Sequence, residues 1–362
     1  MTKPLNILLL SKYGRLGAST RLRSLQYIPY LKQCGIHIHW QQLISDAELS
    51  ARYKAGGYRH FEVLQAYARR LRAMHNRRAY DAVIIEKEAL PWAPLWVERA
   101  MLGGVPYILD YDDAIFHNYD RHRLGIVRRL YGRRLDGLMA KAALMIGGNS
   151  YLAQRAKDAG TRRVAVLPTA IDLDRYQVRD TALVNTPPRI VWIGSPSTVA
   201  YLNILREPLQ QLAQTTPFVL RIIGGGAIDL PGVQTEVVTW AEATEVQSIR
   251  SCDIGIMPLL DTPWEAGKCG YKLIQYMACG LPVVGSDIGV NPDIVPHGQC
   301  GYLASTPQQW LAALTSLLQD PALRQRLGQA GRNRVEQHYC IQQTGPRLAE
   351  LIRSVLVPRD NV

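Results

Sequence analysis

Residues 261–284 read DTPWEAGKCGYKLIQYMACGLPVV, and this stretch decides the fold. Gly280 followed by Pro282 predicts the end of a helix, because glycine accepts the left-handed cap and proline cannot continue a helix. The apolar run Leu281–Val284 then predicts a return to a buried strand. A helix that leads into a short, continuously apolar strand is typical of a parallel α/β sheet.

Similar apolar runs recur along the chain before this stretch. They are continuous rather than alternating in polarity, as strands buried on both faces are. After the first run, a glycine-containing loop and Ser19-Thr20 predict a helix that runs toward Gly35. We therefore predict an α/β chain of two Rossmann-like, doubly wound domains. The predicted strands are Leu5–Leu10, Ala82–Ile85, Pro106–Leu109, Leu144–Gly147, Val164–Leu167, Ile190–Ile193, Phe218–Ile223, Ile254–Met257 and Val283-Val284.

The length of 362 residues also favours two domains. Two prolines and small polar residues over 180–188 predict a linker. The predicted division is an N-terminal acceptor-binding domain over 1–183, a nucleotide-sugar-binding domain over 184–340, and a helix over 341–362 that can pack back on the first domain. Ligands of open parallel sheets bind at the carboxyl ends of the strands, which predicts a cleft between the two domains.

The composition excludes several classes of protein. Apolar residues make up 47% and charged residues 20%, which excludes a disordered, collagenous or coiled-coil chain. No apolar run reaches the roughly 18 residues of a membrane span, so we expect a cytoplasmic protein. The six cysteines are scattered without a Cys-x-x-Cys pair, which argues against a zinc site or a disulfide framework.

Positive charge is confined to the first half of the chain. Residues 1–183 hold 29 Lys and Arg against 16 Asp and Glu, whereas residues 184–362 hold 13 against 14. Such a surface attracts an anionic membrane or a phosphorylated substrate, and a solvated helix face is the alternative. Aromatic residues do not interleave with the arginines, which argues against nucleic acid. The excess is concentrated in Arg69, Arg70, Arg72, Arg77, Arg78, Arg121, Arg123, Arg128, Arg129, Arg133 and Arg134.

Two lysines in the opening stretch predict an anion site. Lys268 and Lys272 lie four residues apart, and like charges at this spacing destabilise an isolated helix. An anion between them offsets that repulsion, and a helix start near Gly270 adds free amide groups. The spacing therefore predicts a phosphate or diphosphate site, with two solvated lysines as the alternative.

The segment Lys268–Val284 resembles the donor-site signature of the retaining glycosyltransferases of family 4, which have the GT-B fold. Other blocks resemble the family in the same order along the chain. They are Ser19–Arg23, Gly148–Leu152, Val166–Asp172 and Trp192–Pro196.

The resemblance implies transfer of a sugar from a nucleotide-diphosphate-sugar, which is a substrate and not a cofactor, to an acceptor that enters from the N-terminal domain. We infer that Lys268 and Lys272 hold the donor diphosphate, with Gly194, Ser195, Ser197, Thr198, Gly270 and Tyr271 around it. Gln275 falls where the family binds the ribose, and Trp240 where it holds the nucleobase, although a core position is the alternative for Trp240.

This sequence departs from the family at the first of two glutamates that usually lie seven residues apart. Aligned on Met277–Gly280, the second glutamate falls on Gln275 and the first on Gly267, with Glu265 two residues early. The family's usual Arg and Lys after the first strand of this domain are also missing. We infer that Lys268 takes a catalytic role together with Glu265.

Three carboxylates follow a predicted strand in the first half, at Asp110, Asp112 and Asp113. One reading is a metal site, because Asp-x-Asp pairs bind Mg²⁺ or Mn²⁺, but the family generally needs no metal ion. The reading that we adopt is that Asp112 or Asp113 orients the acceptor hydroxyl or the transferred sugar. A turn cluster is the alternative.

The first loop supplies four further candidates for the N-terminal side of the cleft. Gly14 and Gly17 permit a tight loop, and Arg21 and Arg23 can face phosphates or pair with surface acids.

The sequence therefore predicts a retaining, metal-independent glycosyltransferase of bacterial envelope polysaccharide or lipopolysaccharide synthesis. Its partners are a nucleotide-sugar, a glycan or lipid-linked acceptor and an anionic membrane surface, with no nucleic acid. One alternative is a non-catalytic protein that binds nucleotide-sugars or polyanions. The other is a GT-B-like epimerase that converts the donor without an acceptor.

Overall fold

The computed structural model describes residues 3–55, 57, 60–180 and 185–356. They form two compact units. Unit 1 contains the chain up to Thr169, the short segment Gly267–Cys269 and the chain from Thr344 onward. Unit 2 contains Ala170–Ala266 and Gly270–Gln343.

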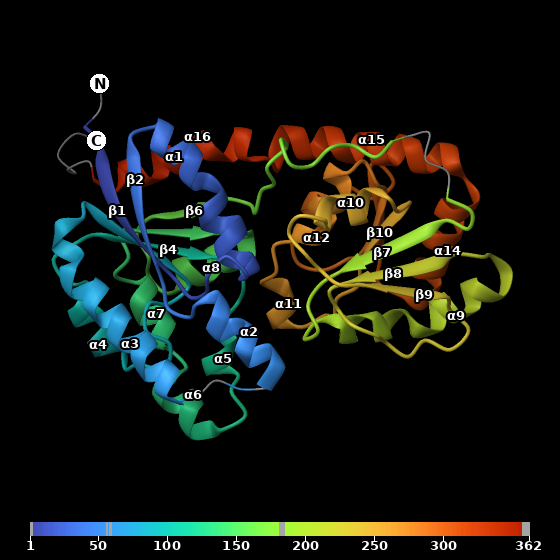
Figure 1. Cartoon of the computed structure of the whole chain (residues 1–362). Coiled ribbons are helices and arrows are strands. Elements are labelled where there is room, and N and C mark those ends of the chain that lie inside the picture. The colour runs from blue at the N-terminus through green and yellow to red at the C-terminus, as the bar shows by residue number, and fades with distance from the viewer. Residues whose placement is uncertain (1–2, 56, 58–59, 181–184, 357–362) are drawn as a thin grey trace. The chain divides into compact units, whose positions relative to one another are not determined.

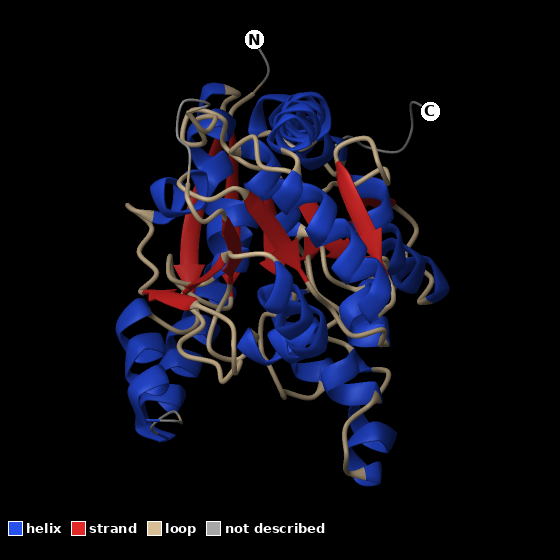
Figure 2. Cartoon of the chain, turned by 90° about the vertical axis from the view of Figure 1, so that its right-hand side faces the viewer, coloured by secondary structure: helices blue, strands red, loops and turns tan. Residues whose placement is uncertain are grey.

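Unit 1 is built on a six-stranded sheet whose pairs are all parallel, in the order β2-β1-β3-β4-β5-β6. Figure 2 shows the whole chain with its helices in blue and its strands in red, and the helices surround the strands. The strands are β1 (Leu5–Ser11), β2 (Ile36–Gln42), β3 (Ala82–Glu86), β4 (Tyr107–Tyr111), β5 (Leu144–Gly147) and β6 (Val164–Val166). The helices are α1 (Ile28–Gln33), α2 (Asp46–Ala55), α3 (His60–His75), α4 (Leu95–Leu102), α5 (His117–Asp120), α6 (Gly125–Tyr131), α7 (Arg134–Met139), α8 (Ser150–Asp158) and α16 (Ile341–Ser354), which begins in unit 2.

Unit 2 repeats this design with six parallel strands in the order β12-β11-β10-β7-β8-β9. The strands are β7 (Arg189–Ile193), β8 (Val219–Ile223), β9 (Thr235–Val238), β10 (Ile254–Met257), β11 (Val283–Ser286) and β12 (Gly301–Ala304). The helices are α9 (Arg206–Thr215), α10 (Glu245–Arg250), α11 (Pro263–Ala266), α12 (Tyr271–Ala278), α13 (Asn291–Ile294), α14 (Pro307–Gln319) and α15 (Pro321–His338), and a 3-10 helix spans Val199–Leu205.

Two separate apolar cores pack on the two faces of the unit 2 sheet. One core joins α10, α12 and Val335 of α15 to the sheet, and the other joins α9 and α14 to its opposite face. Figure 1 shows these helices as two layers, with α10 and α12 on one side of β7, β8 and β10 and α9 on the other. A sheet buried on both faces explains why its central strands are continuously apolar.

The predicted fold class is confirmed, and each of the nine predicted apolar runs forms a strand. Three further strands, β2, β9 and β12, have no counterpart among the predicted runs. Each of them lies at the edge of its sheet. The helix predicted from Ser19 is interrupted, because a π-helical turn (Thr20–Ser24) and a 3-10 turn (Leu25–Tyr27) precede α1.

The division into compact units falls at Thr169 and Ala170, earlier than the boundary expected between 183 and 184. That expected boundary, and residues 181–184 of the predicted linker, lie outside the described residues. The part of α16 that belongs to unit 1 is fixed there by polar contacts. The Thr344 and Tyr27 hydroxyls lie 2.8 Å apart, and Arg163 donates to the carbonyl of Ser354 at 2.7 Å.

Across the described ranges, no helix has the length and apolar character that a membrane crossing requires.

Candidate functional site

Glycines line the carboxyl ends of β7 and β8 in unit 2. Gly194 follows β7, and Gly224 follows β8 with a φ of 77°. A Cβ on Gly224 would lie 2.6 Å from the carbonyl oxygen of Gly194 and 2.9 Å from the Cβ of Trp240. The two glycines therefore permit tight packing where the two strands end, at the edge where open parallel sheets bind ligands.

A hydrogen-bond network joins the two residues predicted to bind the nucleoside. Gln275, buried on α12, donates from its amide to the Tyr176 hydroxyl at 2.8 Å. Tyr176 donates to the Glu245 carboxylate at 2.6 Å, and the Trp240 indole donates to its other oxygen at 2.6 Å. The Tyr271 hydroxyl lies 3.4 Å from that of Tyr176. The structure thus brings Gln275, Trp240 and Tyr271 together through two residues that the sequence analysis missed, Tyr176 and Glu245.

Gly270 forms the start of α12. Its φ of 62° lies in the left-handed region, and a Cβ there would overlap the side chain of Ile294. Helix α12 therefore begins at Tyr271, and Lys268 lies outside it. The expectation of two lysines one turn apart on one helix is wrong, because the left-handed Gly270 interrupts the backbone between them. Lys268 belongs to unit 1 and Lys272 to unit 2.

Lys272 lies over the aromatic ring of Trp192, the residue before Ile193 at the end of β7. Its ammonium is 5.6 Å from the ring centroid. A cation over an indole face is attracted by the ring quadrupole. Lys272 is therefore held at the carboxyl end of the unit 2 sheet, beside Gly194.

The hydroxyl residues after Gly194 bond to one another. The Ser195 amide donates to the Thr198 hydroxyl at 3.1 Å, and the Ser195 and Ser197 hydroxyls lie 2.8 Å apart. Thr198 is the residue before the 3-10 helix Val199–Leu205 and makes no side-chain capping bond to it. The segment is a closed, hydroxyl-rich turn that leads into a 3-10 helix.

Glu265 is buried on α11 and is already engaged. Its two carboxylate oxygens accept hydrogen bonds from the hydroxyls of Tyr201 and Thr262. All three residues belong to unit 2. The carboxylate is therefore oriented by two hydroxyl groups.

In unit 1, a buried lysine organises the carboxylates that follow β4. The Lys87 ammonium lies 2.9 Å from Asp112, 3.1 Å from Asp113 and 2.9 Å from the Ser19 hydroxyl. Burial alone would lower the pKa of Lys87, but the two carboxylates raise it well above its usual value. Burial likewise works against Asp112, yet Lys87 lowers the pKa of that carboxyl below its ordinary value. Both groups are therefore charged near neutral pH.

The backbone of Lys87 is itself strained. Its φ is 67°, a left-handed conformation that is uncommon for a residue other than glycine. Strained residues at the carboxyl end of a strand cluster at functional sites. No residue pattern in the sequence marked Lys87, since a lone lysine after a strand is ordinary.

Lys268 lies near the same carboxylates. Its ammonium is 3.8 Å from Asp113, and its carbonyl accepts a hydrogen bond from Asn149 at 2.9 Å. The Cys269 thiol donates to the carbonyl of Asp112 at 3.2 Å. A Cβ on Gly267 would overlap Ala114, so only glycine permits this close approach. The structure therefore brings together Lys268, Asp112 and Asp113, three of the four residues predicted to be catalytic.

Arg23 pairs with the third carboxylate. Its guanidinium donates to Asp110 at 3.0 Å and to the Leu167 carbonyl at 2.7 Å, and both ionic side chains are buried. Arg21 donates to the carbonyl of Arg15 at 3.0 Å. Arg23 therefore pairs with a buried acid and not with a surface one.

The two glycines of the first loop pack closely against neighbouring side chains. A Cβ on Gly14 would overlap the Asp46 carboxylate, and one on Gly17 would lie 2.5 Å from the Cβ of Tyr13. Asp46 also accepts from the Leu16 amide at 2.9 Å. The loop is therefore tight, as the two glycines predicted.

Glu86, the last residue of β3, is buried with neither carboxylate oxygen in a hydrogen bond. Burial raises the pKa of Glu86 to about 7, despite the neighbouring Lys87 ammonium. The sequence analysis missed this residue, because a single glutamate at the end of an apolar run carries no signal of its own.

The carboxylates of this region are balanced by side-chain cations. Asp110 pairs with Arg23, while Asp112 and Asp113 pair with Lys87. Within the described part of the chain, no group of three or more His, Cys, Asp and Glu side chains is arranged to hold a metal ion. These five side chains form an ionic cluster near the carboxyl ends of β3 and β4, and Lys268, 3.8 Å from Asp113, is its third cation.

The family match lies in the second half of the chain. Residues 187–320 match the family model described as Glycosyl transferases group 1. The chain is 34% identical over 186 residues to spore coat protein SA of Bacillus subtilis, covering 46% of this chain and 48% of that protein. It is 27% identical over 228 residues to a D-inositol 3-phosphate glycosyltransferase of Thermobispora bispora, and the alignment covers 62% of this chain and 46% of that protein.

A longer alignment links the chain to the putative colanic acid biosynthesis glycosyltransferase WcaL of Salmonella typhimurium. The two are 23% identical over 290 residues, which cover 73% of this chain and 69% of that protein. The chain spans about half the length of the first two curated relatives.

Solved structures match over nearly the whole chain. HepE of Anabaena in complex with UDP and glucose superposes with a TM-score of 0.71 at 16% identity, covering 97% of this chain and all of that one. Sucrose-phosphate synthase of Thermosynechococcus elongatus superposes with a TM-score of 0.70 at 14% identity, covering 98% and 99%. The two parallel-sheet, Rossmann-like units therefore have the fold of the GT-B glycosyltransferases.

Proposed function

We propose that this chain is a retaining, metal-independent glycosyltransferase that moves a sugar from a nucleotide-diphosphate-sugar to a glycan or lipid-linked acceptor. The relatives that match the chain include glycosyltransferases, and the structural neighbour HepE binds UDP and glucose. UDP-sugars are therefore the first donors to test. In this proposal the acceptor belongs to envelope polysaccharide synthesis, and the protein works in the cytoplasm at the membrane surface.

The observation that carries the proposal is the network at the carboxyl ends of the unit 2 strands. Gln275 and Trp240 are joined there through Tyr176 and Glu245. We assign Gln275 to the donor ribose, Trp240 to the nucleobase, and Lys272 with Gly194, Ser195, Ser197, Thr198, Gly270 and Tyr271 to the diphosphate. A lysine and a helix start at the carboxyl end of a parallel sheet suit a phosphate ligand.

In the proposed reaction, the bond between the anomeric carbon and the phosphate oxygen breaks, and its electron pair stays on the phosphate. The acceptor hydroxyl forms the new bond on the same face of the sugar and gives its proton to the departing phosphate. Negative charge on that phosphate grows in the transition state, so cations directed at it accelerate transfer. We assign this stabilisation of the departing phosphate to the ammonium groups of Lys268 and Lys272.

On the unit 1 side, we assign Asp112 and Asp113 to the orientation of the acceptor or the transferred sugar. Lys87 holds both carboxylates in place. Gly14, Gly17, Arg21 and Arg23 shape the first loop. Glu265 is assigned to the transferred sugar, with Tyr201 and Thr262 fixing its carboxylate.

A second candidate is a non-catalytic protein that binds nucleotide-sugars. It is favoured by the engagement of Glu265 with two hydroxyl groups, because a carboxylate so occupied has less capacity to bind a sugar. The two candidates differ in turnover and share donor binding.

The experiment is calorimetry of the purified protein with a panel of nucleotide-diphosphate-sugars, followed by product analysis with envelope glycan acceptors. We expect one donor to bind and to yield a glycoside with the anomeric configuration of the donor. Donor binding without a product from any acceptor supports the binding protein. Conversion of the donor without an acceptor indicates an epimerase, and an inverted product removes the retaining assignment.

A further inference from the structure

Helix α6 of unit 1 has an exposed apolar surface. None of its residues is buried, and Ile126 and Leu130, one turn apart, are 60% and 68% exposed. Leu124, just before the helix, is 51% exposed. Leaving three large apolar side chains in water is unfavourable, so such a patch marks an interaction surface.

Two tryptophans extend this surface. Trp92 is half exposed, and its ring lies 5.9 Å from His122 and 6.1 Å from Tyr131 of α6. Trp96, in the first turn of α4, is 73% exposed. We call Trp92, Trp96, Leu124, Ile126 and Leu130 the apolar patch.

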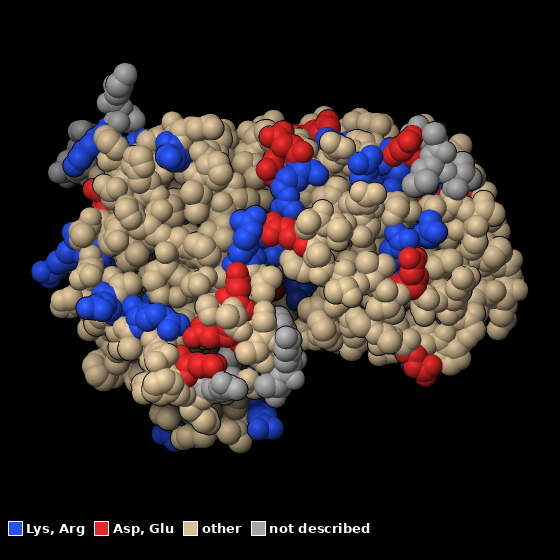
Figure 3. Space-filling model, viewed as in Figure 1, with Lys and Arg blue, Asp and Glu red and all other residues tan. Residues whose placement is uncertain are grey.

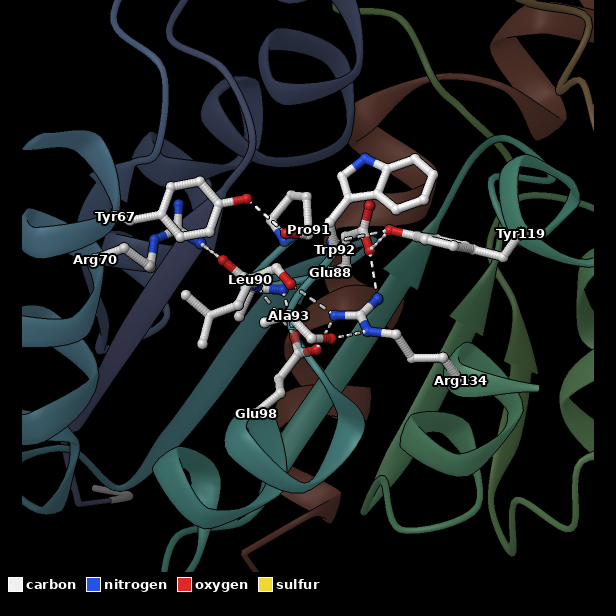
Figure 4. Close-up of polar contacts among 11 residues, drawn as sticks. Tyr67, Arg70, Glu88, Leu90, Pro91, Trp92, Ala93, Glu98, Tyr119 and Arg134 are labelled. Atoms are coloured by element: carbon white, nitrogen blue, oxygen red, sulfur yellow. Dashed lines mark hydrogen bonds and ion pairs between the residues drawn. The ribbon is translucent and has the colours of Figure 1, made fainter. Parts of the chain in front are cut away.

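The loop that carries Trp92 is fixed by a buried ionic network (Figure 4). The Arg134 guanidinium binds Glu88 at 2.6 Å and also pairs with Glu98, and both carboxylates are buried. It donates further to the carbonyl of Ala93 at 2.6 Å and to that of Leu90 at 2.7 Å. Arg134 is therefore buried inside the unit as a brace, and the expectation that it forms part of a basic surface is wrong. The expectation is also wrong for Arg70, which is buried and donates to the carbonyl of Ala89 at 3.1 Å.

This brace holds Trp92 in an unfavourable conformation. Its φ is 62°, rare for a bulky residue, and its amide donates to the Tyr119 hydroxyl at 3.2 Å. Figure 4 shows the indole projecting away from the ionic network. The backbone of Trp92 is strained, and its indole is nevertheless half exposed. Backbone strain of this kind clusters at functional sites, which indicates a function for the Trp92 side chain.

Exposed arginines lie on α6 and in the segments that flank it, and one of them, Arg133, also pairs with Asp136 at 3.6 Å. Residues 121–133 contain no Asp or Glu, and five exposed arginines lie among them. Figure 3 shows Lys or Arg side chains at the lower edge of unit 1, over the region of α6 in Figure 1. The exposed arginines are Arg121, Arg123, Arg128, Arg129 and Arg133.

We propose that α6 and the Trp92 loop dock on an anionic lipid bilayer. Charge complementarity selects this occupant. An anionic bilayer offers an acidic layer for the arginines with hydrocarbon directly beneath it for leucine, isoleucine and tryptophan, whereas a soluble polyanion offers only the charge. The inference deepens the proposed function, because it places the enzyme where a lipid-linked acceptor resides.

The test is flotation of the full chain with vesicles of phosphatidylcholine alone and of an equal mixture with phosphatidylglycerol. We expect binding to the mixed vesicles that weakens as NaCl is added. Replacing both Arg128 and Arg129 by Gln should lower the partition coefficient roughly 30-fold, from about 1 kcal/mol for each arginine. Ile126→Ser with Leu130→Ser should lower it at least about tenfold, since both side chains lose apolar burial in the bilayer.

Matched controls come from unit 2. Val237 is 49% exposed and Arg326 is exposed, so Val237→Ser and Arg326→Gln should leave partitioning unchanged. Brominated lipids should quench the tryptophan fluorescence of the wild type, and the quenching should fall when both Trp92 and Trp96 are replaced by Phe.

Equal binding to both kinds of vesicle, or no binding to either, overturns the proposal. Binding to heparin without binding to the mixed vesicles overturns it as well, and indicates a soluble polyanion. Donor calorimetry on the same variants separates this test from the proposed function. A patch variant that has lost the vesicles but binds donor normally leaves the transferase assignment intact.

Discussion

At the scale of single residues, the candidate site is defined by how each charge is neutralised. Lys87, which the sequence did not mark, balances Asp112 and Asp113 at 2.9 and 3.1 Å. Lys268 stands at 3.8 Å from Asp113, a longer and weaker contact. The Lys268 ammonium is therefore held more weakly by the carboxylates than the Lys87 ammonium is. A weakly held ammonium suits the binding of a phosphate.

The first prediction concerns Lys268. We expect Lys268→Ala to reduce product formation by on the order of 10²- to 10³-fold, as removal of one transition-state donor does, and to leave the fold intact. Product formation under saturating donor measures the effect, and circular dichroism checks the fold. Lys141→Ala is the matched control, because this lysine is exposed in the same unit. Unchanged turnover in Lys268→Ala would remove its catalytic assignment.

The second prediction concerns the unpaired carboxyl of Glu86. Burial raises the pKa of Glu86 from 4.5 to about 7. Between these values the folded chain keeps a proton that the unfolded chain has lost, so this group lowers the free energy of unfolding as the pH rises from about 4.5 to 7. Glu86→Gln removes that loss.

Urea unfolding of the wild type and of Glu86→Gln, at about pH 5 and about pH 8, measures how the free energy of unfolding of each protein changes with pH. The variant should gain on the order of 3 kcal/mol relative to the wild type between the two values, because one pKa unit corresponds to about 1.4 kcal/mol. A difference between the two proteins that does not change with pH would show that Glu86 is ionised in the folded state.

At the scale of helices and strands, the sequence predicts the strands that appear in it as continuous apolar runs, the pattern that burial on both faces of a sheet produces. All nine predicted strands are continuous apolar runs, and β5 and β10 match their predicted bounds. The missed strands β2, β9 and β12 lie at sheet edges, where one side is open to solvent and polar residues are tolerated. The sequence of β2, IHIHWQQ, shows this mixture.

The site was predicted less completely than the fold, for a related reason. Gln275 and Trp240 could be located by their place in a motif. Tyr176 and Glu245, which join them, lie far away in the chain and belong to no local pattern. A helix start near Gly270 was predicted, but the left-handed conformation of Gly270 and its close packing against Ile294 were not.

The third prediction tests that packing. Gly270→Ala should destabilise the chain by on the order of 3 kcal/mol, because the new Cβ meets Ile294 in addition to the strain of a positive φ. Gly232→Ala is the control. Gly232 has a φ of 81° and no atom within 4 Å of its added Cβ, so this variant carries the backbone strain alone. Equal losses in urea unfolding would show that the contact with Ile294 is unimportant.

At the scale of the whole molecule, chemistry and charge are divided between the two units. Unit 2 holds Lys272 and the hydrogen-bond network that joins Gln275 to Trp240. Unit 2 also contains most of the segment that matches the group 1 family model, residues 187–320. Unit 1 holds the carboxylate cluster, the apolar patch and most of the excess positive charge. In the proposed function, unit 2 binds the donor and unit 1 binds the acceptor.

The most direct test is the dissociation constant of the donor selected by the panel, measured by calorimetry for the wild type and for Lys272→Met. Methionine keeps the apolar length of the side chain over Trp192 and removes the charge. We expect the constant to rise about 10- to 100-fold, since a hydrogen bond to a charged group contributes about 1.5 to 3 kcal/mol. An unchanged constant, with the donor still bound, would contradict the assignment of Lys272 to the diphosphate and with it the donor site described for unit 2.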